Sequence, residues 1–305
     1  MPKPEVAIMI EGQAGVNWPR WMRMARAVED LGFAGLYRSD HFTNPNGPMQ
    51  DSLDLWVSLT WLAGNTERIE FGPLVSPVSF RHPAHTARWA SAIDDLSGGR
   101  LTLGMGAGWQ EREHTSYSFD LLDIPGRFAR FEEALHIVSH QLHNDAPLTF
   151  EGAYYTFKDA ELMPRPQRHV PILIGGNGPR RTLPLVARFA DEWNAVFLTP
   201  QVFAQRNAQL DEMLRQQGRE PGTVRRSLMT GLVFGLNRGE LEAQVAQQGA
   251  DTPHELRGRG LVVGTPDELP EQLEKLGEVG VQRVMLQWFA LDDMDRLETF
   301  AHAVL

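Results

Sequence analysis

Short apolar runs alternate with amphipathic stretches along the whole chain. The apolar runs predict strands over residues 6–10, 34–38, 69–75, 101–105, 171–174, 194–198, 227–234 and 284–289. The amphipathic stretches predict helices over residues 17–31, 52–63, 83–96, 127–143, 179–190 and 200–217, and a last helix through Leu297, Phe300, Ala301 and Val304. Strands that alternate with helices in this way are typical of βαβ units and a parallel sheet. Eight such units favour an α/β fold of the (β/α)8 TIM-barrel type, with an open doubly wound sheet as the alternative.

The alternation continues without a linker, so residues 1–305 are expected to form one barrel domain. Three connections are longer than a barrel needs, namely 106–126, 144–170 and 235–265. We therefore expect insertions after strands 4 and 7, and a hairpin within 144–170. The segment 235–265 is polar and is expected to be partly mobile. Long loops of this kind often form lids or bind ligands.

Composition removes several classes of protein from consideration. The chain has no cysteine, which excludes disulfides, thiolate metal ligands and a cysteine nucleophile. The net charge is -10 and no dense run of lysine and arginine is present, so nucleic acid is not an expected partner. No apolar run reaches the ~18 residues of a membrane span, and residues 1–5 do not resemble a signal peptide. A cytoplasmic enzyme with a small-molecule substrate is the expectation.

Polar residues follow the first two predicted strands. Glu11 comes directly after the first strand, and Asp40 and His41 come directly after the second. In a barrel, residues at the carboxyl ends of strands face the active site. A buried aspartate beside a histidine can hydrogen-bond a ligand and move a proton, whereas the simpler interpretation is an aspartate that caps a turn beside an exposed histidine. The position at a strand end favours the functional interpretation.

Two glycine-rich segments follow later strands. Residues 104–109 (Gly-Met-Gly-Ala-Gly-Trp) end the fourth strand, and their small side chains would let a flat ligand approach the backbone. Their spacing does not match the dinucleotide fingerprint. Residues 175–182 (Gly-Gly-Asn-Gly-Pro-Arg-Arg-Thr) open a helix, where free N–H groups, the helix dipole and two arginines would bind an anion such as phosphate. A plain glycine turn is the alternative in both places.

Histidines at helical spacing do not make a convincing metal site. His136, His140 and His143 lie in the last turns of a predicted helix, where cationic side chains complement the helix dipole. The glutamate of a zinc-protease motif is missing from this run. We predict no metal centre. The serine elbow of hydrolases and the carboxylate pair of glycosidases are also absent.

Five segments together resemble a known family. They are residues 74–84, residues 94–109, Glu11-Gly12, residues 38–42 and residues 175–178. In combination they resemble the bacterial luciferase-like monooxygenase superfamily, and within it the oxidoreductases that use a deazaflavin, coenzyme F-420. The resemblance covers essentially the whole chain, and its most specific part is residues 68–135.

The resemblance implies a (β/α)8 barrel with a flavin-like ring over the strand ends. It implies His41 and Asp40 as the catalytic residues, and a non-prolyl cis peptide near Leu74-Val75 beside the ring. It implies that the cofactor contacts the following residues: Glu11, Asp40, His41, Leu74, Val75, Ser76, Gly106, Ala107, Gly108, Trp109, Arg127, Gly175, Gly176, Asn177, Gly178 and Arg181. It also implies a homodimer.

Two departures from the family bear on the substrate. The sugar-phosphate dehydrogenases of the family have a proton-donating glutamate after strand 4, and Trp109 stands near that place, with Glu111 and Glu113 beyond it. Their set of phosphate-binding lysines is also missing, which argues against glucose 6-phosphate. Hydride transfer between F-420 and a moderately hydrophobic organic molecule is the leading hypothesis. A flavin mononucleotide (FMN) monooxygenase and a non-catalytic cofactor-binding protein are the alternatives.

Overall fold

The structure, a computed structural model, describes residues 3–305 and contains a closed parallel barrel. Its strands are β1 (Glu5–Ile10), β2 (Gly35–Arg38), β3 (Glu70–Pro73), β4 (Ser76–Pro77), β5 (Leu103–Gly106), β8 (Ile172–Gly175), β9 (Glu192–Val196), β10 (Arg225–Phe234) and β12 (Arg283–Gln287). They pair in the order β3-β2-β1-β12-β10-β9-β8-β5-β4, all in parallel. β3 and β4 are two halves of one bent strand, so the pairing closes on itself. The predicted (β/α)8 barrel is confirmed.

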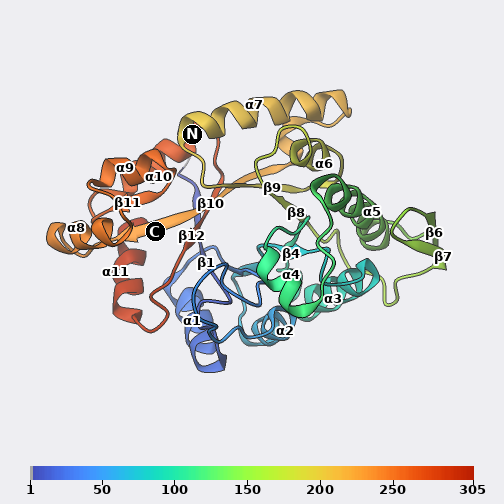
Figure 1. Ribbon diagram of the computed structural model, residues 1–305, viewed down its shortest axis with the longest axis horizontal. Helices are drawn as coiled ribbons and strands as arrows, with labels where there is room; N and C mark the ends of the chain where they lie inside the picture. Colours follow the sequence, from blue (N-terminus) through green and yellow to red (C-terminus); the bar gives the residue numbers. More distant parts are fainter. Residues whose placement is uncertain (1–2) are drawn as a thin grey trace.

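Helices surround this ring of strands (Figure 1). They are α1 (Trp18–Leu31), α2 (Leu55–Asn65), α3 (Pro83–Leu96), α5 (Ile124–His143), α6 (Thr182–Phe189), α7 (Pro200–Gln216), α10 (Leu269–Glu278) and α11 (Met294–Val304), with a 3-10 turn at Pro221–Thr223. The first helix shows how the sequence sets their limits. Its N-cap, Asn17, accepts a hydrogen bond from the Arg20 N–H at 3.2 Å, and Gly32 ends it at a φ of 94°. No helix of the described residues is both long and apolar enough to cross a membrane.

The strands are mostly apolar between their ends because both of their faces are buried. Along β1, Val6, Ile8 and Ile10 pack outward against the helices. The alternate residues Ala7 and Met9 point inward, where they share a separate cluster with residues of other strands. The barrel interior is therefore a packed core, and a ligand site has to lie at one of its ends.

The amino-terminal end of the barrel is closed by a buried ion-pair network. The Arg283 side chain, at the start of β12, is only 1% exposed. Its guanidinium contacts the carboxylates of Glu5, Glu70 and Glu192, and donates a hydrogen bond to the Tyr37 hydroxyl at 2.6 Å. These groups fill the base of the barrel. The carboxyl ends of the strands form the open end.

The insertions are more regular than the sequence suggests. The predicted hairpin is present as β6 (Leu148–Glu151) and β7 (Thr156–Ala160). Residues 106–126 contain α4 (Glu111–Tyr117). The polar connection over 235–265, expected as a long loop, instead contains α8 (Arg238–Gln247), α9 (Pro253–Gly258) and β11 (Val262–Gly264). β11 extends the sheet by pairing with the second half of β10, and a small apolar cluster supports it.

Candidate active site

A cavity of about 550 Å³ opens at the carboxyl ends of the barrel strands. A larger hollow, about 680 Å³, lies outside the barrel and is lined mainly by α2 and α3, so size alone does not identify the site. Predicted cofactor-contacting residues that line the strand-end cavity are Glu11, His41, Leu74, Val75, Gly106, Ala107, Gly108, Trp109, Arg127, Gly175 and Gly176. Asp40, Ser76, Asn177, Gly178 and Arg181 are not among its lining side chains.

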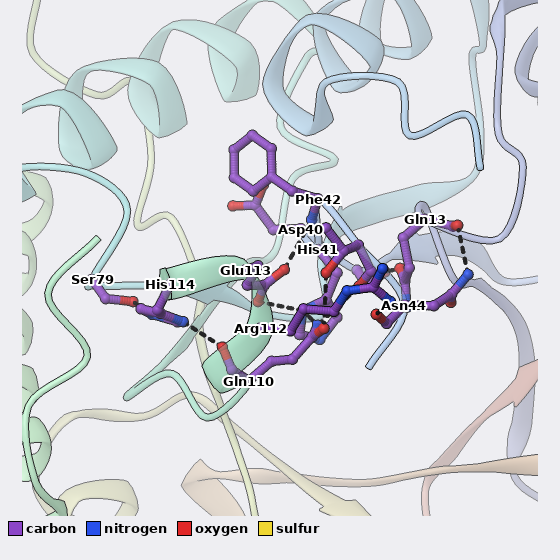
Figure 2. A network of polar contacts seen from close by, with 12 residues as sticks. Gln13, Asp40, His41, Phe42, Asn44, Ser79, Gln110, Arg112, Glu113 and His114 are labelled. Carbon is purple, nitrogen blue, oxygen red and sulfur yellow. Dashed lines mark hydrogen bonds and ion pairs between the residues drawn. The ribbon is translucent and has the colours of Figure 1, made fainter. Parts of the chain in front are cut away.

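His41 is held at the cavity wall by a buried carboxylate from α4. Its Nδ1 lies 2.8 Å from Glu113 Oε1, and the other oxygen, Oε2, accepts the Phe42 N–H at 3.0 Å. The Glu113 side chain is 1% exposed and the His41 side chain 18%. Figure 2 shows Glu113 and Gln110 both directed at this ring, and the Gln110 amide nitrogen lies 3.0 Å from Nδ1. Because the carboxylate only accepts, the proton of the ring lies on Nδ1, and Nε2 is left for a ligand.

Opposing effects set the proton affinity of His41. Burial alone would lower the pKa of the imidazole, but the hydrogen bond and charge of Glu113, with smaller contributions from Glu11 and Asp40, raise it overall. Trp109 packs edge-on against the ring, with centroids 5.5 Å apart. A histidine in this setting holds its proton to a higher pH than a free histidine, which suits a proton donor at neutral pH.

Asp40 does not hydrogen-bond the His41 ring within the described residues, although the two are neighbours in sequence. Its carboxylate is bound by both terminal nitrogens of Arg81, one of them at 3.1 Å, and by the Ser76 hydroxyl at 2.8 Å. Burial raises the pKa of Asp40, and Arg81 and Ser76 oppose that rise. The structure therefore places Asp40 and Ser76 behind the cavity wall, where they fix the segment that carries His41.

The bent third strand forms part of the cavity wall. A non-prolyl cis peptide joins Leu74 to Val75, as the family resemblance implies. The Val75 side chain is directed at the glycines of neighbouring strands, and a Cβ atom on Gly106 would lie 2.6 Å from Val75 Cγ2. Any larger residue at position 106 would thus displace Val75. The small residues here, which were predicted to let a ligand approach the backbone, are therefore needed to leave space for the Val75 side chain.

The glycine loop after β8 offers backbone donors beside the cavity. Gly176 adopts a φ of 125°, and the Gly178 carbonyl accepts the first N–H groups of α6. The N–H groups of Asn177 and Gly178 donate to no other group within residues 3–305. The Asn177 side chain instead pairs with the backbone of Val196, so it fixes the loop. The loop has the form of an anion site.

The two predicted phosphate-binding arginines differ in position. Arg127 lines the cavity, and its Nε donates to the Leu122 carbonyl at 2.8 Å, which holds the guanidinium in place. Arg181 is exposed and lies over the Phe128 ring, 6.0 Å from its centroid. Only Arg127 is placed to contact a ligand inside the cavity.

No role was predicted for Gln110 or Arg81, and no contact was predicted between Glu113 and His41. Glu113 and Gln110 come from an insertion in which no helix is predicted. α4 is fixed on one side by Arg112, which donates to the Gly47 carbonyl, and on the other by His114, which hydrogen-bonds Ser79 (Figure 2). No sequence pattern predicts this packed helix, because the run Glu-Arg-Glu-His at 111–114 is charged although Glu113 and His114 are buried in the structure.

The histidines of α5 do not converge on one point. His136 packs against the Phe150 ring, and His140 contacts the Ala146 carbonyl. His143 alone turns toward the barrel base.

Comparison with known proteins shows which family this chain matches. Residues 6–250 match the model of the luciferase-like monooxygenase family. The chain is 34% identical, over 168 residues, to an F-420-dependent glucose-6-phosphate dehydrogenase of Microbacterium testaceum (strain StLB037), covering 54% of this chain and 48% of that protein. It is 27% identical, over 207 residues, to a putative coenzyme F-420-dependent oxidoreductase of Mycobacterium tuberculosis, covering 64% and 56%. The matched regions span about half the length of these curated relatives.

Solved structures share the fold over nearly the full chain. An F-420-dependent secondary alcohol dehydrogenase in complex with an F-420–acetone adduct superposes with a TM-score of 0.83 at 18% identity, covering 99% of this chain and 98% of that one. The F-420-dependent tetrahydromethanopterin reductase of Methanopyrus kandleri gives a TM-score of 0.78 at 20% identity, covering 98% of both chains. With the match over residues 6–250, these findings establish that the chain belongs to the luciferase-like monooxygenase family.

Proposed function

We propose that this protein transfers hydride between coenzyme F-420 and a neutral, largely apolar alcohol or carbonyl compound, with His41 as the proton donor or acceptor. One observation carries the proposal: a histidine hydrogen-bonded to a buried glutamate lies on the wall of a 550 Å³ strand-end cavity that Arg127 and Gly176 also line. The curated relatives named F-420-dependent support the choice of cofactor.

The cavity lining fits a deazaflavin with a phosphate-bearing tail. Leu74, Val75 and Ala107 offer apolar surface to a flat ring. Arg127 and the N–H groups of Asn177 and Gly178, next to the start of α6, suit a phosphate. When bound, the cofactor would supply the carbon that accepts or returns the hydride. The protein has to supply orientation and the proton.

His41 would handle that proton. In the oxidation of an alcohol, Nε2 would accept the hydroxyl proton as the hydride leaves carbon; in the reverse direction it would donate to the carbonyl oxygen. Glu113 would stabilise the resulting imidazolium through Nδ1 and keep the ring directed at the cavity. In pairs of this kind one residue takes the proton as the base, and the second holds that base in position.

The lining favours a substrate without a phosphate group. The three lysines of the chain, Lys3, Lys158 and Lys275, are all outside the cavity. Arg127 is the one arginine that lines it, and the cofactor tail would take that charge. Trp109, 58% exposed, and Phe197, 38% exposed, supply apolar surface at the cavity. A sugar phosphate would leave its charge without a partner.

The test is a titration of the purified protein with F-420 and, separately, with FMN, followed by absorbance and fluorescence. We expect saturable binding of F-420, and turnover with secondary alcohols or ketones but none with glucose 6-phosphate. Tight binding of FMN alone would instead favour the monooxygenase hypothesis. Binding of F-420 without turnover of any alcohol or carbonyl would favour a cofactor-binding protein.

Arg127→Gln should weaken binding of F-420 by about 10- to 100-fold, because a charge-assisted hydrogen bond to phosphate contributes roughly 1.5–3 kcal/mol. Arg181→Gln is the matched control and should change the dissociation constant little, since Arg181 lies outside the cavity. Fluorescence titration of both variants gives the comparison. Equal losses of F-420 affinity in the two variants would mean that the tail of the cofactor runs across α6 instead.

Glu113→Gln should move the pH profile of substrate reduction to lower pH. Burial lowers the pKa of His41, and the charge of Glu113 more than offsets this; without the charge, the proton is lost at a lower pH. Reduction requires a protonated His41, so its rate falls as pH rises through that pKa. The variant should therefore lose activity at lower pH than the parent in a kcat profile. An unchanged profile with a uniformly lower rate would mean that Glu113 only positions the ring.

A further inference from the structure

A second group of polar side chains lies at the opposite end of the barrel from the cavity. His143 is the last residue of α5, His169 precedes β8, and Asp191 directly precedes β9. One potential ligand atom from each residue lies within 4.8 Å of the other two. These residues are brought together by the fold, since the turns at the amino-terminal ends of neighbouring parallel strands are adjacent in space.

The contacts around this group already orient its side chains. His169 Nε2 lies 2.8 Å from Asp191 Oδ1, and Asp191 Oδ2 accepts the Ile172 N–H at 2.9 Å. His143 Nε2 donates to the Val170 carbonyl at 2.8 Å, so the lone pair of the neutral ring lies on Nδ1. Metal-bound imidazoles commonly hold their second nitrogen on a carbonyl in this way.

The two imidazole rings lie face to face. Their centroids are 3.8 Å apart and their planes differ by 20°, so two protonated rings would repel strongly. The lone pairs of imidazole lie in the ring plane, so the exposed His169 has to turn out of this stack before both rings can bind one ion. Neutral imidazole is the form that binds metal ions.

We propose that His143, His169 and Asp191 form a binding site for a divalent transition metal ion of the zinc class. Two imidazoles and one carboxylate are ligands that Zn²⁺, Ni²⁺ and Cu²⁺ prefer, whereas Mg²⁺ and Ca²⁺ prefer oxygen alone. The ion would replace the proton that His169 and Asp191 share. Arg219 donates to the Ala190 carbonyl beside Asp191, so negative charge is limited here and selectivity comes from the nitrogens.

The role of this site is to stabilise the fold. It would tie the end of α5 to the starts of β8 and β9, at the end of the barrel that has no contact with the proposed cofactor. The exposed His169 side chain, 58% accessible, gives an ion direct entry.

The experiment uses the full chain after chelator treatment and dialysis. We expect calorimetric titration of the parent protein with ZnCl2 to show one site per chain, and the bound ion to raise its melting temperature. The His169→Ala variant should lack this site. Co²⁺ should give the visible absorption bands of a tetrahedral site. His169→Ala and His143→Ala should each weaken Zn²⁺ binding at least tenfold, because each removes a ligand. His136→Ala, on the exposed face of the same helix, is the matched control and should bind as the parent does.

Each result of this experiment either supports or contradicts the proposed metal site. His169 is exposed, so its alanine variant should fold, and a loss of Zn²⁺ binding there cannot be attributed to unfolding. If His169→Ala and His143→Ala bind Zn²⁺ as tightly as the parent, the metal lies elsewhere, for example at His41 and Glu113, and the proposal is wrong. A parent protein that does not bind Zn²⁺, Ni²⁺ or Cu²⁺ would also overturn it.

Discussion

Replacement of His41 by alanine should lower kcat for hydride transfer by about 10²- to 10⁴-fold, the usual contribution of general acid–base catalysis. Its Nδ1 is held by Glu113 at 2.8 Å, and Nε2 is the one titratable ring atom left to meet a substrate in the cavity. The dissociation constant of F-420 should change much less, because Arg127, the glycine loop and the apolar wall remain. Single-turnover rates with pre-bound cofactor, compared with equilibrium binding, separate the two effects.

A matched control makes this loss interpretable. His140 lies on α5 nine residues beyond Phe131, the last residue of that helix to line the cavity, and its Nε2 lies 2.9 Å from the Ala146 carbonyl. His140→Ala should keep the parent's kcat. If His41→Ala instead retains kcat while weakening cofactor binding, then His41 contacts the cofactor without moving a proton. In that case the proton donor has to be sought among the other titratable groups of the lining, Glu11 first.

The sequence predicted the barrel well for a physical reason. In a parallel barrel both faces of each strand are buried, so a strand tends to appear as a compact apolar run, as residues 6–10 of β1 do. The helix limits follow from local capping, for example at Asn17 and Gly32. Residues 235–265 were predicted poorly because α8 and α9 are short and polar, and a small separate cluster around Leu241 stabilises them.

Only those site residues that lie near the end of a strand were predicted. His41, Val75 and Gly176 line the cavity because they lie within three residues of the carboxyl end of a strand. The partners that fix their chemistry come from distant segments. Glu113 is 72 residues from His41, and Arg81 is 41 residues from Asp40. Side-chain pairing over such separations leaves no periodic signal in the sequence, so neither the Glu113–His41 contact nor the Arg81–Asp40 contact could be predicted from it.

Arg81→Met should destabilise the protein by about 3–5 kcal/mol at neutral pH, the usual cost of leaving one partner of a buried ion pair alone. The Asp40 side chain is 4% exposed and its carboxylate takes both terminal nitrogens of Arg81. Without Arg81, the Ser76 hydroxyl is its one remaining side-chain hydrogen bond among the described residues. Denaturant unfolding at pH 7 measures the loss.

The pH dependence of this loss has a definite sign. Burial already raises the pKa of Asp40 above its ordinary 3.8, and removal of Arg81 raises it further. A carboxyl group with a raised pKa in the folded state binds its proton more tightly there, so folding is favoured as pH falls. The stability gap between Arg81→Met and the parent should therefore narrow as pH falls from neutrality toward 3.8.

Two further variants separate the buried pair from a general effect of losing arginine. Asp40→Asn combined with Arg81→Met should lose less stability than the sum of the single changes, because the second change removes the charge that the first leaves unpaired. Arg23→Met breaks an exposed pair with Asp292 and should leave the free energy of unfolding nearly unchanged. Additive losses in the double variant would show that Asp40 and Arg81 stabilise the fold independently, and the His41 segment would then need another anchor.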